Sequence, residues 1–553
     1  MISLSQGAPA ISVLDAVFVT VAVGLLTHIY FNRFEPFRRL PLIVSLLFLP
    51  FCLSVVFLPH FSIPSSIAIA FLTFHATLLT SIALYRVSPF HPLSGFPGPM
   101  GLKLSALWVY KTAADGKRHL YIQRLHQQYN SDVVRIGPNE ISFRDATAIV
   151  PIMGPNGLPK GPMWDGRTRY SSNRALIGWR DLKMHAKRRR PWTLGLSTAA
   201  IKEYEPTLAE RVEQLACLAM KFEGQTVDLA DFFRKFSFDF MGDMAFGGGS
   251  ELMRDGDVDG SMQLLLDGIA DSNVSGILPW FRYHIPSALN NLITQTAARA
   301  TARIQNGTQR KDLFHYLNNE DGSAKESPPL SVVVAEGRLV TIAGSDTTSA
   351  TLSNILFLLL THRNEYKRLQ EEIDRFYPPG ENSLDSSFHP EMHFLDAVIN
   401  ETLRLYPVIP SGSQRATQRR GTLINSLYVP PNTSVRVHTW SVHRDPRNFS
   451  PFTDAFWPER WLIADDPSSV ERLKIPFTHN VNAYHPFSYG PANCVGKGLA
   501  LKELKMVICR LLQQAEIRLQ DGYDLSEWER IMKDCYTLEV GRLPVVISPR
   551  CTD

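Results

Sequence analysis

The segment Phe487–Gly496, FSYGPANCVG, places one cysteine, Cys494, in a setting that suits a reactive thiolate. Gly490 lies four residues before Cys494 and Gly496 two after it. Glycines let the backbone turn tightly, so that its N–H groups can point at the sulfur. The next residues, KGLALKELKMVICRLL, have apolar side chains at helical spacing, which predicts a helix that begins just after the cysteine. A thiolate at a helix N-terminus is stabilised by the helix dipole, whereas a buried free cysteine between two turns is the alternative.

A second stretch whose residues could take part in chemistry is AGSDTT, residues 343–348, in the middle of a long apolar run. The run predicts a helix over about 331–360. Glycine inside a helix costs about 1 kcal/mol relative to alanine. Neighbouring Ser and Thr side chains can bond to the backbone and bend the helix. An acid and two threonines beside a mid-helix glycine therefore predict a local opening rather than plain structure.

Both stretches resemble those of the cytochrome P450 family, and the resemblance implies a mainly α fold with small β-sheets. The cysteine segment is similar to the family's haem-binding loop, in which the cysteine is the axial iron ligand. By that resemblance Cys494 binds the iron of haem b, and Phe487, Gly490 and Gly496 shape the loop. The AGSDTT stretch resembles the oxygen-activating motif, which implies dioxygen as co-substrate. Thr347 would donate a hydrogen bond to dioxygen, and Asp346 would help relay protons from water.

A basic run, WRDLKMHAKRRRPW at 179–192, resembles the family's helix that crosses one edge of the haem. His185 and Arg189 lie one helical turn apart on the same face. The resemblance implies that both bind a haem propionate, because the guanidinium fork of arginine binds carboxylates in a bidentate manner. Arg415 is the other expected propionate partner. Ala492 stands where the family usually has an Arg or His for a propionate, so haem retention is expected to depend more on these three residues.

A third group of residues has an expected structural role. Glu401 and Arg404 stand in ETLR, and Arg460 follows in FWPERW. An exposed Glu–Arg pair on a helix is worth only a few tenths of a kcal/mol. Together the three residues resemble the family's Glu–Arg–Arg triad behind the haem. A buried carboxylate must be paired and hydrogen-bonded, so the loss of one partner should cost several kcal/mol.

The N-terminal ninety residues have a different composition from the rest. Each of three apolar segments, 11–31, 40–58 and 63–85, is about long enough to cross a bilayer as a helix. A signal peptide would explain the first segment alone, and a buried soluble hairpin is the alternative for the other two, which prolines interrupt. Arg33, Arg38 and Arg39 follow the first segment, which predicts that this loop lies in the cytosol.

These patterns predict a multi-pass protein of the endoplasmic reticulum membrane with a cytosolic catalytic domain. The predicted parts are a membrane anchor over 1–90, a proline-rich hinge over 91–100 and a haem-thiolate catalytic domain over 101–553. The chain has 553 residues, 44% of them hydrophobic, and a net charge of +4, which gives no support to nucleic-acid binding. Its six cysteines include no C-x-x-C pair, which argues against a disulfide framework or a structural zinc site.

The resemblance implies a monooxygenase that inserts one oxygen atom from dioxygen into a small apolar substrate. Electrons would come from a separate NADPH–cytochrome P450 reductase that docks near Lys497, Lys502 and Lys505. The segment 408–412 would lie along the substrate pocket, and the loop 534–538 would re-enter it. Phrases such as GPMWDGR and GPANCVGK resemble oxygenases of basidiomycete fungi, often found in terpenoid pathways of secondary metabolism. The alternatives are a haem-thiolate isomerase or dehydratase that needs no external oxygen, and a non-catalytic haem-binding membrane protein.

Overall fold

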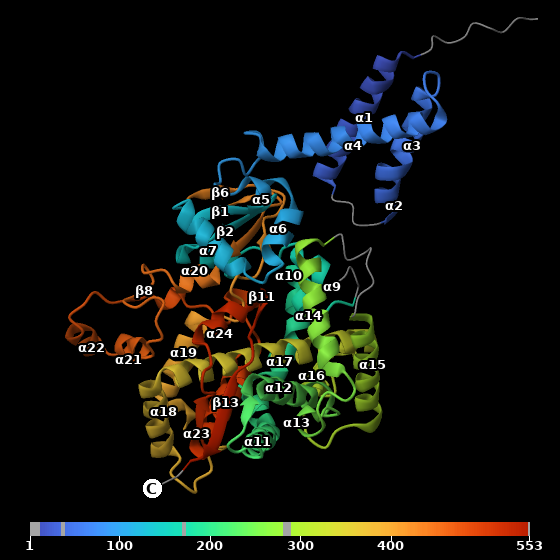
Figure 1. Ribbon diagram of the computed structural model, residues 1–553. Helices are drawn as coiled ribbons and strands as arrows, with labels where there is room; N and C mark the ends of the chain where they lie inside the picture. The colour runs from blue at the N-terminus through green and yellow to red at the C-terminus, as the bar shows by residue number, and fades with distance from the viewer. Residues whose placement is uncertain (1–10, 35–38, 169–172, 280–288, 551–553) are drawn as a thin grey trace, which may run out of the picture.

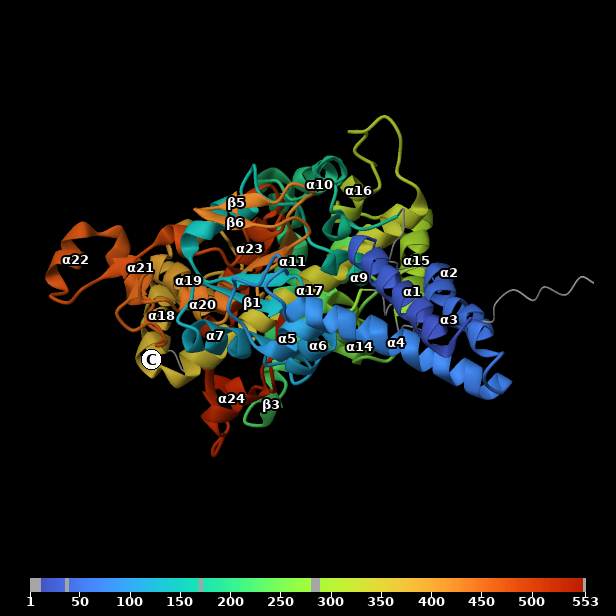
Figure 2. The same cartoon turned by 90° about the horizontal axis from the view of Figure 1, so that it is seen from above.

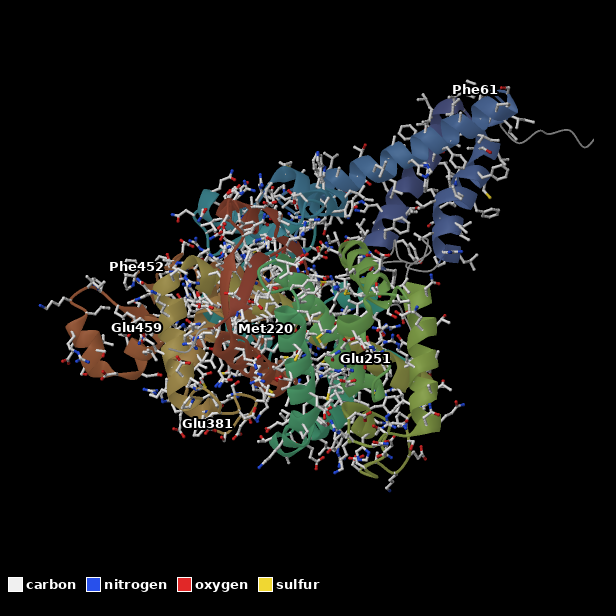
Figure 3. All side chains as sticks on the ribbon, turned by 60° about the horizontal axis from the view of Figure 1, so that its bottom comes forward. Phe61, Met220, Glu251, Glu381, Phe452 and Glu459 are labelled. Carbon is white, nitrogen blue, oxygen red and sulfur yellow. The ribbon has the colours of Figure 1, made fainter. Side chains whose placement is uncertain are left out.

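The N-terminal helices project from the rest of the molecule in the computed structural model, which describes residues 11–34, 39–168, 173–279 and 289–550 (Figure 1). Three helical stretches are long and apolar enough to cross a membrane. They are α1 (Val13–Arg33), the stretch Arg39–Phe57 and α4 (Ile63–Val87). The middle stretch is interrupted, passing from α2 (Arg39–Ile43) through the π-turn η1 (Val44–Phe48) to α3 (Leu49–Leu53) and the 3-10 turn η2 (Ser54–Phe57). Pro50 lacks the N–H that a regular helix needs there. Phe61 lies at the far end of this group (Figure 3).

Helices α1 and α4 lie side by side (Figure 2). Small residues of α1, Ala16, Thr20 and Gly24, are buried at this contact. A Cβ on Gly24 would lie only 3.2 Å from the side chain of Thr77 in α4. Small residues allow such close approach between helices in a membrane. Outward side chains of the second and third stretches, such as Leu47 at 55% and Leu72 at 71%, are exposed, which argues against the soluble hairpin as an alternative.

The body of the molecule is built around α17 (Leu330–Thr361), a helix of 32 residues that crosses its centre. Its main neighbour is α12 (Leu229–Phe246). A Cβ on Gly344 of α17 would lie 2.0 Å from the sulfur of Met241 in α12, so the glycine permits the close contact of the two helices. The expected helix over 331–360 is therefore present.

Further helices surround these two. The long ones are α7 (Arg118–Gln128), α10 (Leu182–Gly195), α11 (Thr198–Met220), α14 (Ser261–Ile277), α15 (Leu289–Asn306), α18 (Arg363–Phe376), α19 (His393–Leu405) and α23 (Lys497–Gln514). The short ones are α5 (Met100–Leu104), α6 (Ala106–Ala113), α8 (Ile149–Met153), α9 (Met163–Thr168), α13 (Leu252–Asp255), α16 (Leu313–Leu317), α20 (Thr439–His443), α21 (Glu459–Asp465), α22 (Pro467–Arg472) and α24 (Leu525–Ile531). Residues 91–99, in the expected hinge, form turns and irregular backbone before α5 begins at Met100.

The β-structure is limited to small sheets. One four-stranded sheet has the order β1-β2-β7-β4, in which β2 pairs antiparallel with β1 and parallel with β7. A three-stranded sheet has the order β10-β13-β3, and the pairs β5-β6, β8-β9 and β11-β12 form two-stranded sheets. The strands are β1 (Val133–Gly137), β2 (Glu140–Phe143), β3 (Thr226–Asp228), β4 (Arg415–Ala416), β5 (Thr422–Ile424), β6 (Leu427–Val429), β7 (Ser434–Val437), β8 (Phe449–Ser450), β9 (Thr478–His479), β10 (Ala515–Leu519), β11 (Lys533–Cys535), β12 (Thr537–Glu539) and β13 (Pro544–Pro549). The expected fold class, mainly α with small β-sheets, is confirmed.

Candidate active site

Cys494 lies three residues before the start of α23, as the sequence predicts. The backbone N–H of Cys494 donates to the carbonyl of Phe487 at 2.8 Å, which closes the loop. Gly490 has φ +71°, and a Cβ there would lie 2.1 Å from the carbonyl oxygen of Met153, so only glycine fits. Gly496 differs from the expectation, because its φ is −85° and a Cβ would make an ordinary 3.9 Å contact with the sulfur. The tight turn therefore depends on Gly490.

The thiol of Cys494 is accessible although protein surrounds it, as expected for a residue on the wall of a cavity. Burial raises its pKa. The backbone N–H groups of Gly496 and Lys497 and the positive charge of Arg189 act in the opposite direction and favour the thiolate. A metal ion bound to the sulfur would complete its ionisation, since a coordinating thiol is deprotonated.

Next to the loop lies a cavity of about 520 Å³, bounded by α10, the end of α8 and the start of β4. Six basic side chains line it, together with Ala492. Two of the six are Arg180 and Arg190, and the other four are Lys160, His185, Arg189 and Arg415. The expected partners His185, Arg189 and Arg415 are therefore brought to one cavity. Lys160 was not foreseen. Its ammonium donates to the carbonyl of Ile177 at 2.7 Å.

The basic cluster, Lys160, His185, Arg189 and Arg415, contains more positive charge than the protein neutralises. The pKa of His185 is lowered to about 3, first by burial and then by the charges of the other three residues. Burial and the charges of Arg415 and Arg189 also lower the pKa of Lys160. Glu336 acts on Lys160 with the opposite sign. Buried charge is costly unless an anion compensates it, so the cluster suits a ligand with negative groups.

Two hydrogen-bonding details distinguish the arginines of the basic cluster. Arg189 is held by Asn493, with bonds of 2.7 Å to its carbonyl and 2.6 Å to its side-chain oxygen. Arg415 is 4% exposed, and its Nε has no hydrogen-bond partner among the described residues. A buried donor without an acceptor is expected where a ligand supplies one. A thiol, a basic cluster and an orphaned guanidinium together fit haem, whose iron takes the sulfur and whose two propionates take the cations.

On α17, Ala343 is exposed although most of the surrounding helix is buried, so this face borders open space. Thr347 lies one turn further on the same face, and its hydroxyl donates to the Ala343 carbonyl at 2.7 Å. The expected local opening is not present: α17 is regular α-helix throughout its described length. The glycine of the motif is explained by packing against α12 instead.

Asp346 points away from Thr347, because successive residues of a helix are about 100° apart. Its neighbour is Thr537 of β12, whose side chain forms a hydrogen bond with it, while Oδ2 has no partner among the described residues. Burial raises the pKa of Asp346 to about 6, and the Thr537 bond partly offsets this. The two motif residues thus face different neighbours.

The expected triad is assembled. Glu401, Arg404 and Arg460 are fully buried, with 0% side-chain exposure. Arg404 donates to both carboxylate oxygens of Glu401, at 2.9 and 2.8 Å, and Arg460 donates to one at 3.1 Å. The indole N–H of Trp461 and the backbone N–H of Trp457 add bonds at 3.0 and 3.1 Å. The charge of Glu401 is therefore compensated by protein alone.

Two further buried acidic residues, Glu336 and Glu503, were not predicted from the sequence. Glu336 of α17 accepts bonds from the Leu176 N–H at 2.9 Å and from the Trp192 indole at 3.2 Å. Its pKa is raised to about 7, mainly by burial. Glu503 of α23 is 1% exposed, and burial raises its pKa well above the usual range. Glu503 follows the buried Leu499 by four residues, which places it on the same face of α23. This spacing is the signal in the sequence that could have predicted the burial of Glu503.

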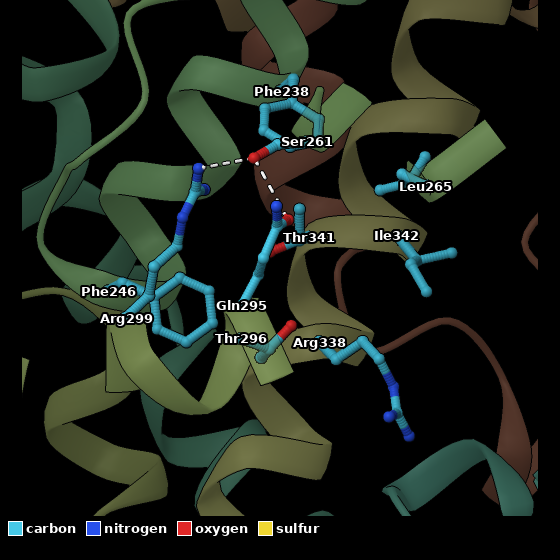
Figure 4. A pocket seen from close by; sticks show the side chains of 10 residues that line it. All are labelled: Phe238, Phe246, Ser261, Leu265, Gln295, Thr296, Arg299, Arg338, Thr341 and Ile342. Carbon is cyan, nitrogen blue, oxygen red and sulfur yellow. Dashed lines mark hydrogen bonds between the residues drawn. The ribbon is translucent and has the colours of Figure 1, made fainter. Parts of the chain in front are cut away.

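A second cavity, of about 20 Å³, lies between α12, α14, α15 and α17 (Figure 4). Ser261 bridges two of its walls, since Arg299 donates to its hydroxyl at 3.0 Å and the hydroxyl reaches Gln295 at 3.4 Å. Such a volume holds about one water molecule. It is too small to bind a substrate.

The cytochrome P450 family model matches residues 96–530. The chain is a cytochrome P450. It is 30% identical to the cytochrome P450 monooxygenase notG′ of Aspergillus versicolor over 98% of this chain and 99% of that protein. It is 32% identical to the monooxygenase nodW of Hypoxylon pulicicidum over 87% of each chain, and 27% identical to the tryprostatin B 6-hydroxylase of Aspergillus fumigatus over 86% of this chain and 84% of that protein.

Family membership confirms the expected class of enzyme, a monooxygenase related to fungal P450s. It also implies a haem-thiolate centre and dioxygen as co-substrate. The fit of the cavity to haem agrees with this implication, because Pro491 and Ala492 of the cysteine loop line the same space as the basic cluster, and Cys494 of that loop is exposed.

Proposed function

We propose that this P450 inserts one oxygen atom from dioxygen into an apolar secondary metabolite, with a terpenoid as the first candidate. The observation that carries the proposal is the accessible thiol of Cys494 beside a cavity lined by unneutralised basic side chains. The apolar N-terminal helices, which are long enough to cross a membrane, support an apolar substrate class.

In the proposed site Cys494 would bind the iron of haem b, from the loop that Phe487, Gly490 and Gly496 shape. Arg415 offers its free Nε to a propionate, and His185 and Arg189 lie on the same cavity. When bound, the haem supplies oxygen activation and the transfer of oxygen to a C–H bond. The protein contributes ligation, orientation and protons.

Thr347 and Asp346 are the proposed proton-handling residues. The Thr347 hydroxyl faces the open side of α17 and can accept a hydrogen bond while it donates to Ala343. A carboxyl with a pKa of about 6 exchanges its proton near neutral pH, which suits Asp346 to general acid–base work. Thr347→Ala should uncouple NADPH consumption from hydroxylation. Unchanged coupling would remove Thr347 from this role.

The triad of Glu401, Arg404 and Arg460 has a proposed structural role. Arg404 donates to the carbonyls of His443 and Thr453, at 2.9 and 2.6 Å, so the triad ties α19 to the segment before the cysteine loop. We infer that it holds that loop in register behind the haem.

NADPH–cytochrome P450 reductase is the proposed electron donor. Of the three expected docking lysines, Lys502 is paired with Glu205 and Lys505 with Asp396 at 2.8 Å. These internal ion pairs make them poor docking residues. Lys497 is exposed, as are Lys183 and Lys187 of α10. We propose that these three attract an acidic reductase surface, and that charge reversal of all three slows reduction in a salt-dependent way.

The proposed location is the endoplasmic reticulum membrane, with several passes and a cytosolic catalytic domain. Arginines on the loop after α1 support this orientation. A C-terminal tag that resists protease in sealed microsomes would contradict it.

Three experiments separate this function from its rivals. Cys494→Ala should abolish the carbon monoxide difference spectrum typical of a haem-thiolate, and a retained spectrum would refute the axial ligand. Product formation without NADPH or reductase would identify an isomerase or dehydratase. Coexpression with a reductase and profiling on terpenes should yield hydroxylated products. A haem protein that consumes no NADPH with any ligand would be the non-catalytic alternative.

A further inference from the structure

Helix α9 presents two side chains to the turn between β11 and β12. Trp164 and Arg167 lie one helical turn apart on one face of α9. The Trp164 ring meets the Tyr536 ring edge-on, with centroids 5.3 Å apart. The Arg167 guanidinium lies 4.4 Å from the centroid of the same tyrosine ring. The Tyr536 ring is thus in contact with both residues of α9.

Both residues of α9 carry buried donors without an acceptor. The indole Nε1 of Trp164 and the Nε of Arg167 have no hydrogen-bond partner among the described residues. Arg167 donates from Nη2 to the carbonyl of Cys535 at 3.2 Å. Leaving buried donors unpaired costs free energy, and most native structures avoid it. An acceptor supplied by a ligand would remove this cost.

Arg167 also differs from other buried arginines of the molecule. Arg303, which is 4% exposed, is paired with Asp312 at 2.7 Å and with Glu320 at 3.1 Å, whereas Arg167 is half-buried. Arg167 forms no ion pair within residues 11–34, 39–168, 173–279 and 289–550. A guanidinium enclosed without a carboxylate partner is expected at a binding site rather than in a structural core.

The turn that holds Tyr536 lies beside the proposed catalytic cavity. On one side, Thr537 bonds to Asp346 of α17. On the other, Tyr536 interacts electrostatically with Arg415 of the basic cluster. Tyr536 has φ +85°, an unfavourable conformation for a residue with a side chain, and such strain is concentrated at functional sites. The turn that Trp164 and Arg167 contact therefore has one neighbour on α17, Asp346, and one in the basic cluster, Arg415.

We propose that Trp164 and Arg167 form an anchor for an sp² oxygen of the substrate, a carboxylate above all, so that the substrate is an apolar skeleton with one acidic or carbonyl group. This inference rests on the proposed function and narrows its substrate class. Arginine suits the task because its fork can bind two oxygens of one carboxylate. The anchored group would fix which carbon of the skeleton faces Thr347, on the open side of α17.

The test uses the full-length haem-loaded protein and three probes whose imidazole binds the iron. They are N-dodecylimidazole, ω-imidazolyl dodecanoic acid and the methyl ester of that acid. Spectral titration gives the affinity of each for the wild type and for Arg167→Met and Trp164→Phe. The wild type should bind ω-imidazolyl dodecanoic acid about tenfold more tightly than N-dodecylimidazole, and it should bind the methyl ester with intermediate affinity. Arg167→Met should lose the preference for the acid and keep its affinity for N-dodecylimidazole.

An equal preference in the wild type and Arg167→Met, or no preference in the wild type, would overturn the anchor. If N-dodecylimidazole gave no spectral shift at all, the proposed haem site would be contradicted. Thermal unfolding would then show whether Arg167 has a binding role or a structural one. Removing an unpaired buried cation should leave the melting temperature unchanged or raise it. The control Arg303→Gln, which breaks an ion pair, should lower it. An equal drop in Arg167→Met would show that Arg167 is purely structural.

Discussion

Two buried groups of charged side chains in this P450 differ in whether the protein itself supplies the opposite charge. In the triad, the carboxylate of Glu401 receives hydrogen bonds from Arg404, Arg460 and two tryptophans, and all its members are fully buried. In the basic cluster around the cavity, Arg415 keeps a free Nε, and positive charges lower the pKa of His185 to about 3. A compensated group stabilises the fold, whereas an uncompensated one prepares a site for an anionic ligand.

Of the changes that test this difference, Glu401→Ala should have the largest effect on the free energy of unfolding. It leaves two buried guanidinium groups without their carboxylate and should cost about 3–5 kcal/mol of stability. Urea unfolding of detergent-solubilised protein would measure the loss. The control Glu391→Ala, at an exposed glutamate, should change stability by less than about 0.5 kcal/mol. Equal effects of the two changes would contradict the structural role of the triad.

The acid beside the basic cluster should produce a pH dependence. Glu336 has a folded pKa of about 7 against an ordinary value of 4.5, so the folded protein holds a proton that the unfolded chain has lost. Stability should therefore fall as pH rises from about 4.5 to about 7 and level off above, by about 2–3 kcal/mol.

Glu336→Gln stays neutral and can still accept from the Leu176 N–H. Its advantage over the wild type should grow across the same pH range, as measured by melting temperature at each pH. Parallel curves for the two proteins would show that Glu336 does not titrate there.

Arg415→Gln should affect the ligand more than the fold. Removing the guanidinium should speed haem loss about tenfold, which corresponds to roughly 1.4 kcal/mol. Transfer of haem to an excess of apomyoglobin measures the rate. The stability of the haem-free protein should stay unchanged or rise, in contrast with the triad variant. Arg420→Gln, at an exposed arginine, is the matched control and should lose haem at the wild-type rate.

The smallest effect is expected at Ala492, which lines the cavity beside the basic cluster. Ala492→Arg adds a donor where the family usually has one, and it should slow haem loss a few-fold while it destabilises the haem-free protein slightly, because the cluster already repels itself. An unchanged rate of haem loss would mean that Lys160, Arg189 and Arg415 already saturate the propionates.

Local patterns allowed much of the site to be predicted. The helix over 331–360 and the helix after Cys494 follow from apolar spacing, and Gly490 needs its left-handed backbone wherever the loop lies. The triad was predictable from two short motifs, ETLR and FWPERW, through their resemblance to those of the family. The expected opening in α17 was wrong, because the sequence does not show that Met241 of α12 requires the glycine for packing.

Other residues depended on long-range contacts. Lys160 and Glu336 belong to none of the motifs that predict the site, and only folding brings them to the cavity or next to it. Lys502 and Lys505 look like free surface lysines until Glu205 and Asp396 pair with them. Asp346 was expected beside Thr347, and its true neighbour, Thr537, comes from a hairpin almost two hundred residues later.

The sequence by itself determined the chemistry of this P450: a thiolate loop, an acid–threonine pair on a long helix and an apolar N-terminal region. These depend on residue type and short spacing, which the chain carries wherever it folds. The tertiary structure alone decided the balance of charge, because burial and distance set the electrostatic energy of every ionisable group. That balance separates the triad, whose two arginines share the carboxylate of Glu401, from the basic cluster, and it leaves Trp164 and Arg167 with donors for a substrate.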